Sequence, residues 1–393
     1  MNDKVVILAA RRTPIGSFQG ALSAATAPQL GAAAARGALV DAGLPGNALD
    51  EVIFGCVLPA GLGQAPARQA ALAAGIDVSV PATTVNKMCG SGMRALMLAA
   101  DQIGAGNATF ALAGGLESMS NAPYLLLKAR AGYRMGHSEL IDHMFYDGLQ
   151  SPWDGQAMGC FAESAADKYG FTRAVQDAFA AESVRRAQRA VRDGDFTGEI
   201  APVTVKSRKG EQRVDRDETP FAVDIEKIPT LKPVFRKDGT VTAASSSSIS
   251  DGAAALVIGR ESAAAARGLK PLARIVSHAS HAQAPEWFTT APAPAIQKAL
   301  DRAGWKTSDV DLYEINEAFA VVTLAAVHDL GLDLARVNVN GGACALGHPI
   351  GATGARLVTT LLHALRRRGL RRGVASQCIG GGEATAICIE LLD

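Results

Sequence analysis

Cys89 stands in a glycine-rich run whose residue types suit nucleophilic chemistry. It precedes Gly90-Ser91-Gly92 and a helical pattern, so we expect it near a helix N-terminus, where backbone N–H groups and the helix dipole stabilise a thiolate. The glycines let a substrate carbonyl approach the backbone, whose N–H groups then become oxyanion donors. The run therefore indicates a nucleophilic thiol. A buried structural cysteine in front of a helix fits the same residues equally well.

Two further residues of reactive type occupy similar settings. His348 lies between Gly347 and Pro349 in a tight loop, which can project an imidazole into a cleft as a base toward a thiol, although an exposed turn histidine fits the loop too. Cys378 ends a strand-like run and precedes Gly380-Gly381-Gly382, a sign that backbone lies close to a ligand. This second thiol is interpreted as a proton carrier or a partner in reversible disulfide chemistry. We predict no metal, because compact ligand spacing is missing.

Asn316 is the fourth candidate, and its sequence context leaves two interpretations open. It ends a predicted strand and begins a predicted helix at Glu317–Leu330. Capping that helix is the common role for an asparagine in such a place. The functional alternative is an amide that orients a water or polarises a carbonyl.

The elements that carry these residues alternate between strands and helices, which predicts a layered α/β fold. Apolar runs predict strands at Val5–Ala9, Glu51–Leu58, Ala108–Gly114, Ala253–Ile258, Ala273–Ser277 and Val310–Glu314. Helical patterns cover Gln29–Ala42, Arg94–Gly104, Glu163–Arg192, Glu261–Arg267, Pro294–Ala303, Glu317–Leu330 and Ala355–Arg368.

The α/β pattern occurs twice. In each copy a strand, a reactive residue, a glycine turn, a helix and a glycine-ended strand follow one another, which predicts a duplicated fold whose Cys89 and His348 loops meet. We expect a first half at 1–118, completed by about 250–270, and a second half at 271–393. The stretch 119–249 is rich in charges, prolines and turns, as expected of a binding insertion.

Composition excludes several classes of protein. The 39 lysines and arginines nearly balance 38 acids, so bulk charge indicates neither nucleic acid nor an anionic membrane as a partner. No apolar run reaches membrane-spanning length, and the run Val5–Ala10 is too short for a signal sequence. The six cysteines form no CxxC pair or dense framework, so we predict reduced thiols and a cytoplasmic location.

Several sequence blocks together resemble the signatures of the thiolase family. They lie in the family's order across the whole chain, and the motifs are highly specific: Asn86-Lys-Met-Cys-Gly-Ser-Gly-Met, Gly114-Gly-Leu-Glu-Ser-Met-Ser120, Asn316-Glu-Ala-Phe, Asn340-Gly-Gly-Ala-Cys-Ala-Leu-Gly-His-Pro-Ile-Gly and Cys378-Ile-Gly-Gly-Gly. Within the family the chain is most similar to acetyl-CoA acetyltransferases. The resemblance implies two thiolase-fold halves, layered αβαβα, with a loop domain inserted in the first.

The resemblance also implies a role for each candidate residue. Cys89 would be acylated, and His348 would draw its proton and help hold the thioester oxygen. Cys378 would exchange the α-proton of the second acetyl-CoA. Asn316 would position a water in one oxyanion hole, and the backbone amides of Cys89 and Gly380 would form the other. The implied reaction is reversible condensation of two acetyl-CoA to acetoacetyl-CoA and CoA.

Coenzyme A is expected as a substrate and product, with no permanently bound cofactor. The positions that match family contacts to it are Leu231, Phe235, Ala243, Ser247, Ala318, Phe319 and Met158. Three departures concern this pocket: Ala157 replaces a histidine, Phe221 replaces an arginine, and Ala244–Ser248 replaces a glycine-containing run. They leave open a broader 3-ketoacyl-CoA thiolase of fatty-acid degradation. The stretch Tyr124–Met144 resembles a tetramerisation loop, which implies a homotetramer.

Two rival hypotheses use the same architecture. A ketoacyl synthase pairs its nucleophile with two histidines, or with a histidine and an asparagine, and Cys378 at the second glycine-rich strand end favours a thiolase instead. A non-enzymatic acyl-CoA-binding scaffold is disfavoured by the intact set of Cys89, Asn316, His348 and Cys378.

Overall fold

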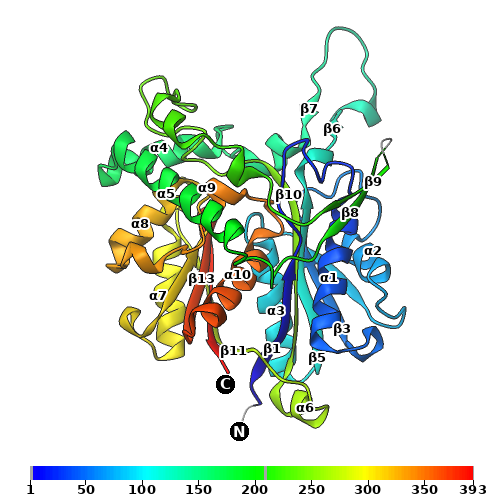
Figure 1. The fold of residues 1–393 in the computed structure, drawn as a ribbon. Helices are drawn as coiled ribbons and strands as arrows, with labels where there is room; N and C mark the ends of the chain where they lie inside the picture. The colour runs from blue at the N-terminus through cyan, green and yellow to red at the C-terminus, as the bar shows by residue number, and fades with distance from the viewer. Residues whose placement is uncertain (1–2, 208–209, 393) are drawn as a thin grey trace.

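The computed structural model describes residues 3–207 and 210–392, and a ten-stranded mixed sheet forms its centre (Figure 1). The strand order is β12-β13-β14-β11-β1-β10-β5-β3-β4, and β2 pairs with β10. The strands are β1 Val5–Arg12, β2 Gly16–Ser17, β3 Glu51–Gly55, β4 Ala82–Val85, β5 Phe110–Ser118, β10 Ser250–Arg260, β11 Ala273–Ala282, β12 Leu312–Ile315, β13 Arg372–Ile379 and β14 Glu383–Leu391.

Helices cover the sheet, and two short hairpins lie apart from it. The helices are α1 Ala27–Ala42, α2 Pro66–Ala73, α3 Ser91–Ala105, α4 Met158–Tyr169, α5 Arg173–Arg192, α6 Glu261–Ala266, α7 Pro292–Ala303, α8 Ala320–Leu330, α9 Ala343–Leu346 and α10 Thr353–Arg368. The hairpins pair β6 Tyr124–Leu125 with β7 Ile141–Asp142, and β8 Val203–Ser207 with β9 Gly210–Val214.

The predicted duplication is confirmed by the pairing pattern of the strands. β3 pairs in parallel with β5, and β10 and β1 continue antiparallel. β12 pairs in parallel with β13, and β14 and β11 continue antiparallel in the same way. Even β4, the parallel neighbour of β3, has a counterpart, because Val337 forms a single parallel bridge to Tyr313 beside β12. The halves join where Val6 and Ile7 of β1 pair with β11.

Alternation along the strands produces the layers. Ala254, Leu256 and Ile258 of β10 face a central core that contains α3 and α10, whereas Ala253, Ala255 and Val257 face an outer core under α1 and α2. A third core lies under α7 and α8. The molecule is therefore a sandwich of outer helices, sheet, central helices, sheet and outer helices, which confirms the expected αβαβα arrangement (Figure 1).

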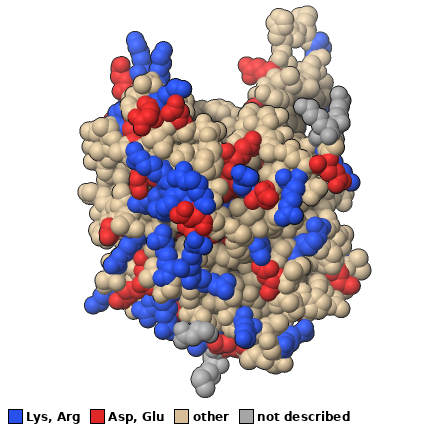
Figure 2. Space-filling view, in the orientation of Figure 1, with Lys and Arg blue, Asp and Glu red and all other residues tan. Residues whose placement is uncertain are grey.

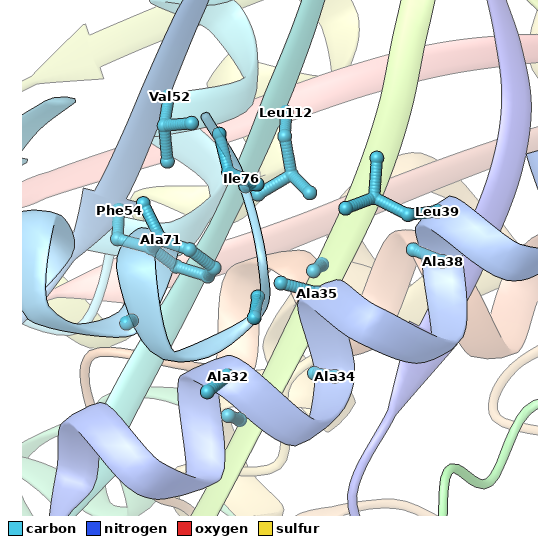
Figure 3. Packing of buried hydrophobic residues seen from close by; sticks show 14 of the residues in the cluster. Ala32, Ala34, Ala35, Ala38, Leu39, Val52, Phe54, Ala71, Ile76 and Leu112 are labelled. Carbon is cyan, nitrogen blue, oxygen red and sulfur yellow. The ribbon is translucent and has the colours of Figure 1, made fainter. Parts of the chain in front are cut away.

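Small side chains allow the helices of these layers to approach the sheet closely. Helix α1 places Ala32, Ala35 and Ala38 in the outer core, and Figure 3 shows them in one cluster with the larger Phe54 and Leu112 of the sheet. The alanines occupy little volume, so the larger side chains of the strands fill the space between the layers.

The prediction of one helix over Glu163–Arg192 was wrong. The chain forms α4 and α5, separated at Gly170, which ends α4 with φ of 66°. Glycine adopts this left-handed conformation without the steric cost of a Cβ. Thr172 then caps α5 with its side chain. The second helix therefore begins at Arg173, just after the break, and the helical periodicity of the sequence continues across it.

The division into two halves, at 1–118 and 271–393, with an insertion at 119–249 stays a prediction. The stretch 119–249 contains α4, α5 and both hairpins and contributes no strand to the central sheet among its described residues. No helix in the described ranges is both long enough and apolar enough to cross a membrane.

Candidate functional site

A cavity of about 270 Å³ lies where loops of both halves meet. It brings together four of the five predicted catalytic residues: Cys89, His348, Cys378 and Gly380. The remaining wall is mostly apolar and includes Met119, Phe145, Leu149, Ala157, Met158, Phe235, Phe288, Ala318, Phe319 and Ile350. An apolar cleft with a few convergent reactive groups is typical of a binding or catalytic site.

A strained turn presents Cys89 to the cavity. The preceding Met88 has φ of 48°, a left-handed conformation that is unfavourable for methionine. The turn is closed by hydrogen bonds from Gly90 N to Lys87 O (3.0 Å) and from Ser91 Oγ to Met88 O (2.6 Å). Lys87 also forms an ion pair with Glu383 of β14, next to the glycine turn that follows Cys378. The Cys89 loop is thus fastened to the other half of the molecule.

The resting state of Cys89 differs from the expectation of a thiolate. Cys89 lies two residues before α3, and burial raises the pKa of its thiol. Backbone N–H groups of Gly380 and of Cys89 itself oppose this effect and lower the pKa. Because burial is the larger effect, the thiol rests in its protonated form and needs a base. The same two N–H groups are the predicted oxyanion donors.

His348 has the tautomer and the charge state of a base. Thr353 Oγ1 donates its only hydrogen to Pro349 O (3.0 Å), so it must accept from Nδ1–H of His348 (2.6 Å). This leaves the lone pair on Nε2, which has no hydrogen-bond partner among the described residues. Burial lowers the pKa of His348 to about 3, so the ring is neutral. A neutral imidazole with a free lone pair can accept a thiol proton.

Cys378 is a neutral thiol beside Cys89. It lies near the carboxyl end of β13, where it is 1% exposed. Burial raises its pKa well above the usual value, and the proximity of Cys89 adds to the rise. At neutral pH this group is therefore a proton donor before it can act as a base.

Asn316 is fully buried behind the cavity and is not part of its lining. The N-cap interpretation was wrong, because α8 begins at Ala320 with Phe319 as its N-cap. Within the described part of the chain, neither Oδ1 nor Nδ2 of Asn316 has a hydrogen-bond partner. A buried amide without a partner is costly, so its polar atoms are available to a water or a ligand.

The residue after Asn316 explains its fixed position. Glu317 accepts hydrogen bonds from Ser183 Oγ (2.7 Å), Asn338 Nδ2 (2.9 Å) and Cys344 N (3.1 Å). These partners belong to α5, to the chain before α9 and to α9 itself. The buried carboxylate thereby holds the backbone of Asn316 between three segments.

Five of the seven predicted CoA contacts line the cavity, namely Met158, Phe235, Ser247, Ala318 and Phe319. The rings of Phe235 and Phe319 meet edge to face with centroids 5.9 Å apart. Leu231 and Ala243 lie outside the lining. A Cβ at position 159 would collide with the Phe235 ring, so Gly159 is what permits this wall.

The sequence interpretation missed part of the wall. Ile350 could have been predicted, because it belongs to the sequence block that carries His348. Phe288 carried no signal of its own, and it reaches the wall from the turn before α7, where it packs edge to face on Phe161 with ring centroids 6.3 Å apart. Such long-range packing leaves no local pattern in a sequence.

The sequence around hairpin β8–β9 contains basic residues, whose charge suits the CoA phosphates: Lys206, Arg208, Lys209 and Arg213. Lys206 pairs with Glu211 (3.2 Å) and Arg213 with Asp215 (3.7 Å), all on exposed side chains, which fits a solvated charged surface. Arg208 and Lys209 lie outside the described residues. Figure 2 shows both signs of charge interspersed over the visible face, as the near-neutral composition implies.

Comparisons with known proteins agree with this geometry. Residues 5–262 match the model of the thiolase N-terminal domain, and residues 269–391 match that of the thiolase C-terminal domain. An acetyl-CoA acetyltransferase of Pseudomonas aeruginosa is 52% identical over 98% of both chains, and one of Escherichia coli is 51% identical over 99% of both.

Solved structures give the same result. A Bacillus anthracis acetyl-CoA acetyltransferase superposes with a TM-score of 0.97 at 44% identity and covers 100% of both chains. The Acat5 thiolase of Ascaris suum, solved in complex with coenzyme A, has a TM-score of 0.94 at 43% identity and covers 99% of this chain and 100% of its own. The chain belongs to the thiolase family.

Proposed function

We propose that the protein is an acetyl-CoA C-acetyltransferase that condenses two acetyl-CoA to acetoacetyl-CoA and CoA, reversibly, through an acetyl-thioester on Cys89. The observation that carries this proposal is the cavity in which loops of both halves bring two thiols, a neutral imidazole and two backbone N–H donors together. A covalent acyl intermediate lets two thioesters use one pocket in turn. The full-length relatives named acetyl-CoA acetyltransferase support the acetyl group as the natural substrate.

In the first half-reaction, His348 Nε2 takes the proton of Cys89, and the thiolate attacks the carbonyl of acetyl-CoA. The N–H groups of Cys89 and Gly380 receive the oxyanion. The carbon–sulfur bond to CoA then breaks. Cys378, protonated at rest, gives its proton to the departing CoA thiolate, so CoA leaves as the thiol and Cys378 becomes the thiolate.

In the second half-reaction, the Cys378 thiolate takes a methyl proton from a second acetyl-CoA. Acylated Cys89 can no longer ionise, so its contribution to the raised pKa of Cys378 is absent at this stage. The carbanion attacks acetyl-Cys89, and a water held by Asn316 helps to stabilise the developing negative charge. Acetoacetyl-CoA forms, and the Cys89 thiolate recovers its proton from His348.

Coenzyme A is the substrate and product of this scheme, and the scheme needs no permanently bound cofactor or metal. Phe235 and Ser247 would contact its pantetheine arm, and Ala318 and Phe319 would lie near the reactive end. The coenzyme A complex of the Ascaris suum thiolase supports this class of ligand. We further propose that the protein is a homotetramer. We also propose a cytoplasmic location, because all six cysteines are free thiols.

A broader 3-ketoacyl-CoA thiolase is the second candidate, and one observation favours it. A chamber of about 350 Å³ adjoins the cavity and shares Gly148, Met158 and Gly380 with it. Ala157 adds space where the family resemblance implies a histidine ring. This space would hold a few more carbons of an acyl chain. Each methylene buried there would contribute about 0.8 kcal/mol to binding.

Thiolysis rates separate the two candidates. We expect the highest kcat/KM with acetoacetyl-CoA and some activity on slightly longer substrates, and Ala157→His should narrow that range. A higher kcat/KM with medium-chain 3-ketoacyl-CoA would replace the acetyl assignment by the broader one.

Mass spectrometry tests the covalent step. Incubation with acetyl-CoA should add one acetyl group to Cys89, and Cys89→Ala should lose the adduct and turnover together. Cys388→Ala is the matched control, because Cys388 is a buried thiol of β14 outside the cavity. An acetyl group on Cys378 with Cys89 unlabelled would overturn the proposed nucleophile.

A further inference from the structure

Glu117 is a fully buried carboxylate at the end of β5 that has no role in the scheme above. Its Oε2 accepts hydrogen bonds from Val57 N (3.0 Å) and Gly351 N (2.9 Å). Its Oε1 accepts from Leu58 N (3.1 Å) and from the Cys56 thiol (3.6 Å). One side chain therefore joins the loop after β3, in the first half, to the His348 loop of the second half.

The contact with Gly351 lies close to both proposed catalytic loops. Gly351 follows His348 by three residues, and a Cβ on it would lie 2.6 Å from Glu117 Oε2 and 3.1 Å from Cys56 Cα. Its carbonyl oxygen would lie 2.9 Å from a Cβ on Gly92, in the first turn of α3 after Cys89. The His348 loop is thus seated against the Cys89 helix at the point where Glu117 holds it.

The chemistry of these contacts requires an ionised acid. All four partners of Glu117 are donors, so both oxygens must accept, and an amide in its place would turn an NH₂ toward N–H groups. Burial raises the pKa of Glu117 to about 7, and the three backbone N–H groups act against that rise. The titratable groups that face it are the Cys56 and Cys89 thiols, whose pKa values its charge raises.

We propose that Glu117 is a positioning residue, which joins the His348 loop to the loop after β3 and so sets the distance between His348 and Cys89. This inference rests on the proposed acyl-Cys89 reaction. A displacement of reacting groups by about 1 Å can cost on the order of 10²-fold in rate, so losing one loop contact should be visible in kcat.

Two variants separate position from charge. Glu117→Gln should lower kcat for acetoacetyl-CoA cleavage by about 10- to 100-fold with little change in KM. It should also shift the pH profile of Cys89 alkylation by iodoacetamide to lower pH, because the negative charge is gone. Glu117→Asp should leave the alkylation profile near that of the wild type, since the charge remains, but should lower kcat because the shorter side chain cannot reach both loops.

Glu199→Gln is the matched control, because Glu199 is a buried carboxylate that pairs with Arg12 outside the cavity. It should lower the Tm and leave the alkylation profile unchanged. If Glu117→Gln reproduced the control, with a lower Tm and an unshifted pH profile of Cys89 alkylation, Glu117 would be structural only. A wild-type kcat in either Glu117 variant would also overturn the proposal. If Glu117→Gln does not fold, Glu117→Asp decides through kcat. Alkylation needs no substrate, so failure of wild-type Cys89 to become acetylated would refute the acyl-enzyme separately.

Discussion

A single hydroxyl group sets the tautomer of His348. Thr353 lies at the start of α10, and its Oγ1 stands between Nδ1 of the imidazole and the carbonyl of Pro349. Because the hydroxyl hydrogen is committed to the carbonyl, the imidazole proton is held on Nδ1. The cavity consequently receives the basic nitrogen, and a hydroxyl group orients the ring where many catalytic histidines use a carboxylate.

Thr353→Val tests this arrangement with nearly unchanged shape. A neutral hydrogen bond contributes about 1 kcal/mol, so kcat for acetoacetyl-CoA cleavage should fall roughly fivefold as the ring samples the other tautomer. Thr359→Val is the control, because Thr359 is buried on the same helix and its hydroxyl donates to Ala355 O, one turn back on that helix. Equal kcat in the two variants would contradict a role for Thr353 in orienting the base.

Cys378 is predicted to act after Cys89 is acylated. Cys378→Ala should still accept acetyl on Cys89, detected by mass spectrometry, but should lose α-proton exchange and condensation. General acid–base catalysis contributes on the order of 10²–10⁴-fold, so the loss should be large. Condensation at a near wild-type rate would show that Cys378 is structural.

At this scale, residues of reactive type were easier to predict from the sequence than the residues that hold them in place. Cys89, His348 and Cys378 stand in glycine-rich runs with specific motifs, and the structure places them in one cavity. Thr353 and Glu117 act through contacts with distant or turn-forming segments, which spacing along a chain does not encode. The protonated state of Cys89 depends on burial, which a local helix pattern cannot report.

At the scale of elements, two glycines with open surroundings differ only in backbone conformation. Gly170 ends α4 with φ of 66°, whereas Gly104 lies inside α3, and neither has an atom within 4 Å of a built Cβ. Gly170→Ala should lower the free energy of unfolding by about 1 kcal/mol, because alanine is strained in the left-handed region. Gly104→Ala should raise it by about 0.5–1 kcal/mol.

Chemical denaturation of both variants measures these changes. Opposite signs are expected, with unchanged m-values. A stabilising Gly170→Ala would mean that the break between α4 and α5 is not fixed by this residue. The sequence pattern joined these two helices because their apolar periodicity runs through the break, and only the left-handed φ at Gly170 reveals the turn.

At the scale of the whole molecule, the projecting hairpin β6–β7 predicts assembly. Between its strands the chain runs far from the body in Figure 1 and carries large exposed apolar side chains. These are Leu126, Leu127, Tyr133, Met135 and Leu140, and Met135 is 99% exposed; Tyr124 of β6 is exposed as well. Such a concentration on one projection is typical of a protein interface.

Light scattering at micromolar concentration should therefore report a tetramer. The double variant Leu127→Asp and Leu140→Asp should shift the mass toward a dimer, since it places charges in an apolar contact. Val78→Asp, at an exposed valine away from the hairpin, should remain tetrameric. A monomeric wild type would refute the assembly.

The duplicated architecture itself followed from the sequence, because the strand, glycine turn and helix recur in order. The way in which the two halves join could not be predicted from the sequence, because it depends on the pairing of only Val6 and Ile7 with β11. Pairing between strands so distant in the chain is decided by the complete sheet, and neither strand alone specifies its neighbour.

The central place of β1 has a consequence during biosynthesis. This strand is made before the other strands of the sheet, and its partners β10 and β11 begin only at Ser250 and Ala273. With roughly 250 residues between Ile7 and its partner Ile258, translation at about 5–20 residues per second leaves β1 unpaired for some 12–50 s. Through that interval the nascent chain exposes two bare edges of an apolar strand, the kind of segment that chaperones shield. Completion of the half that carries Cys89 is thus tied to translation of β10, about two thirds of the way along the chain.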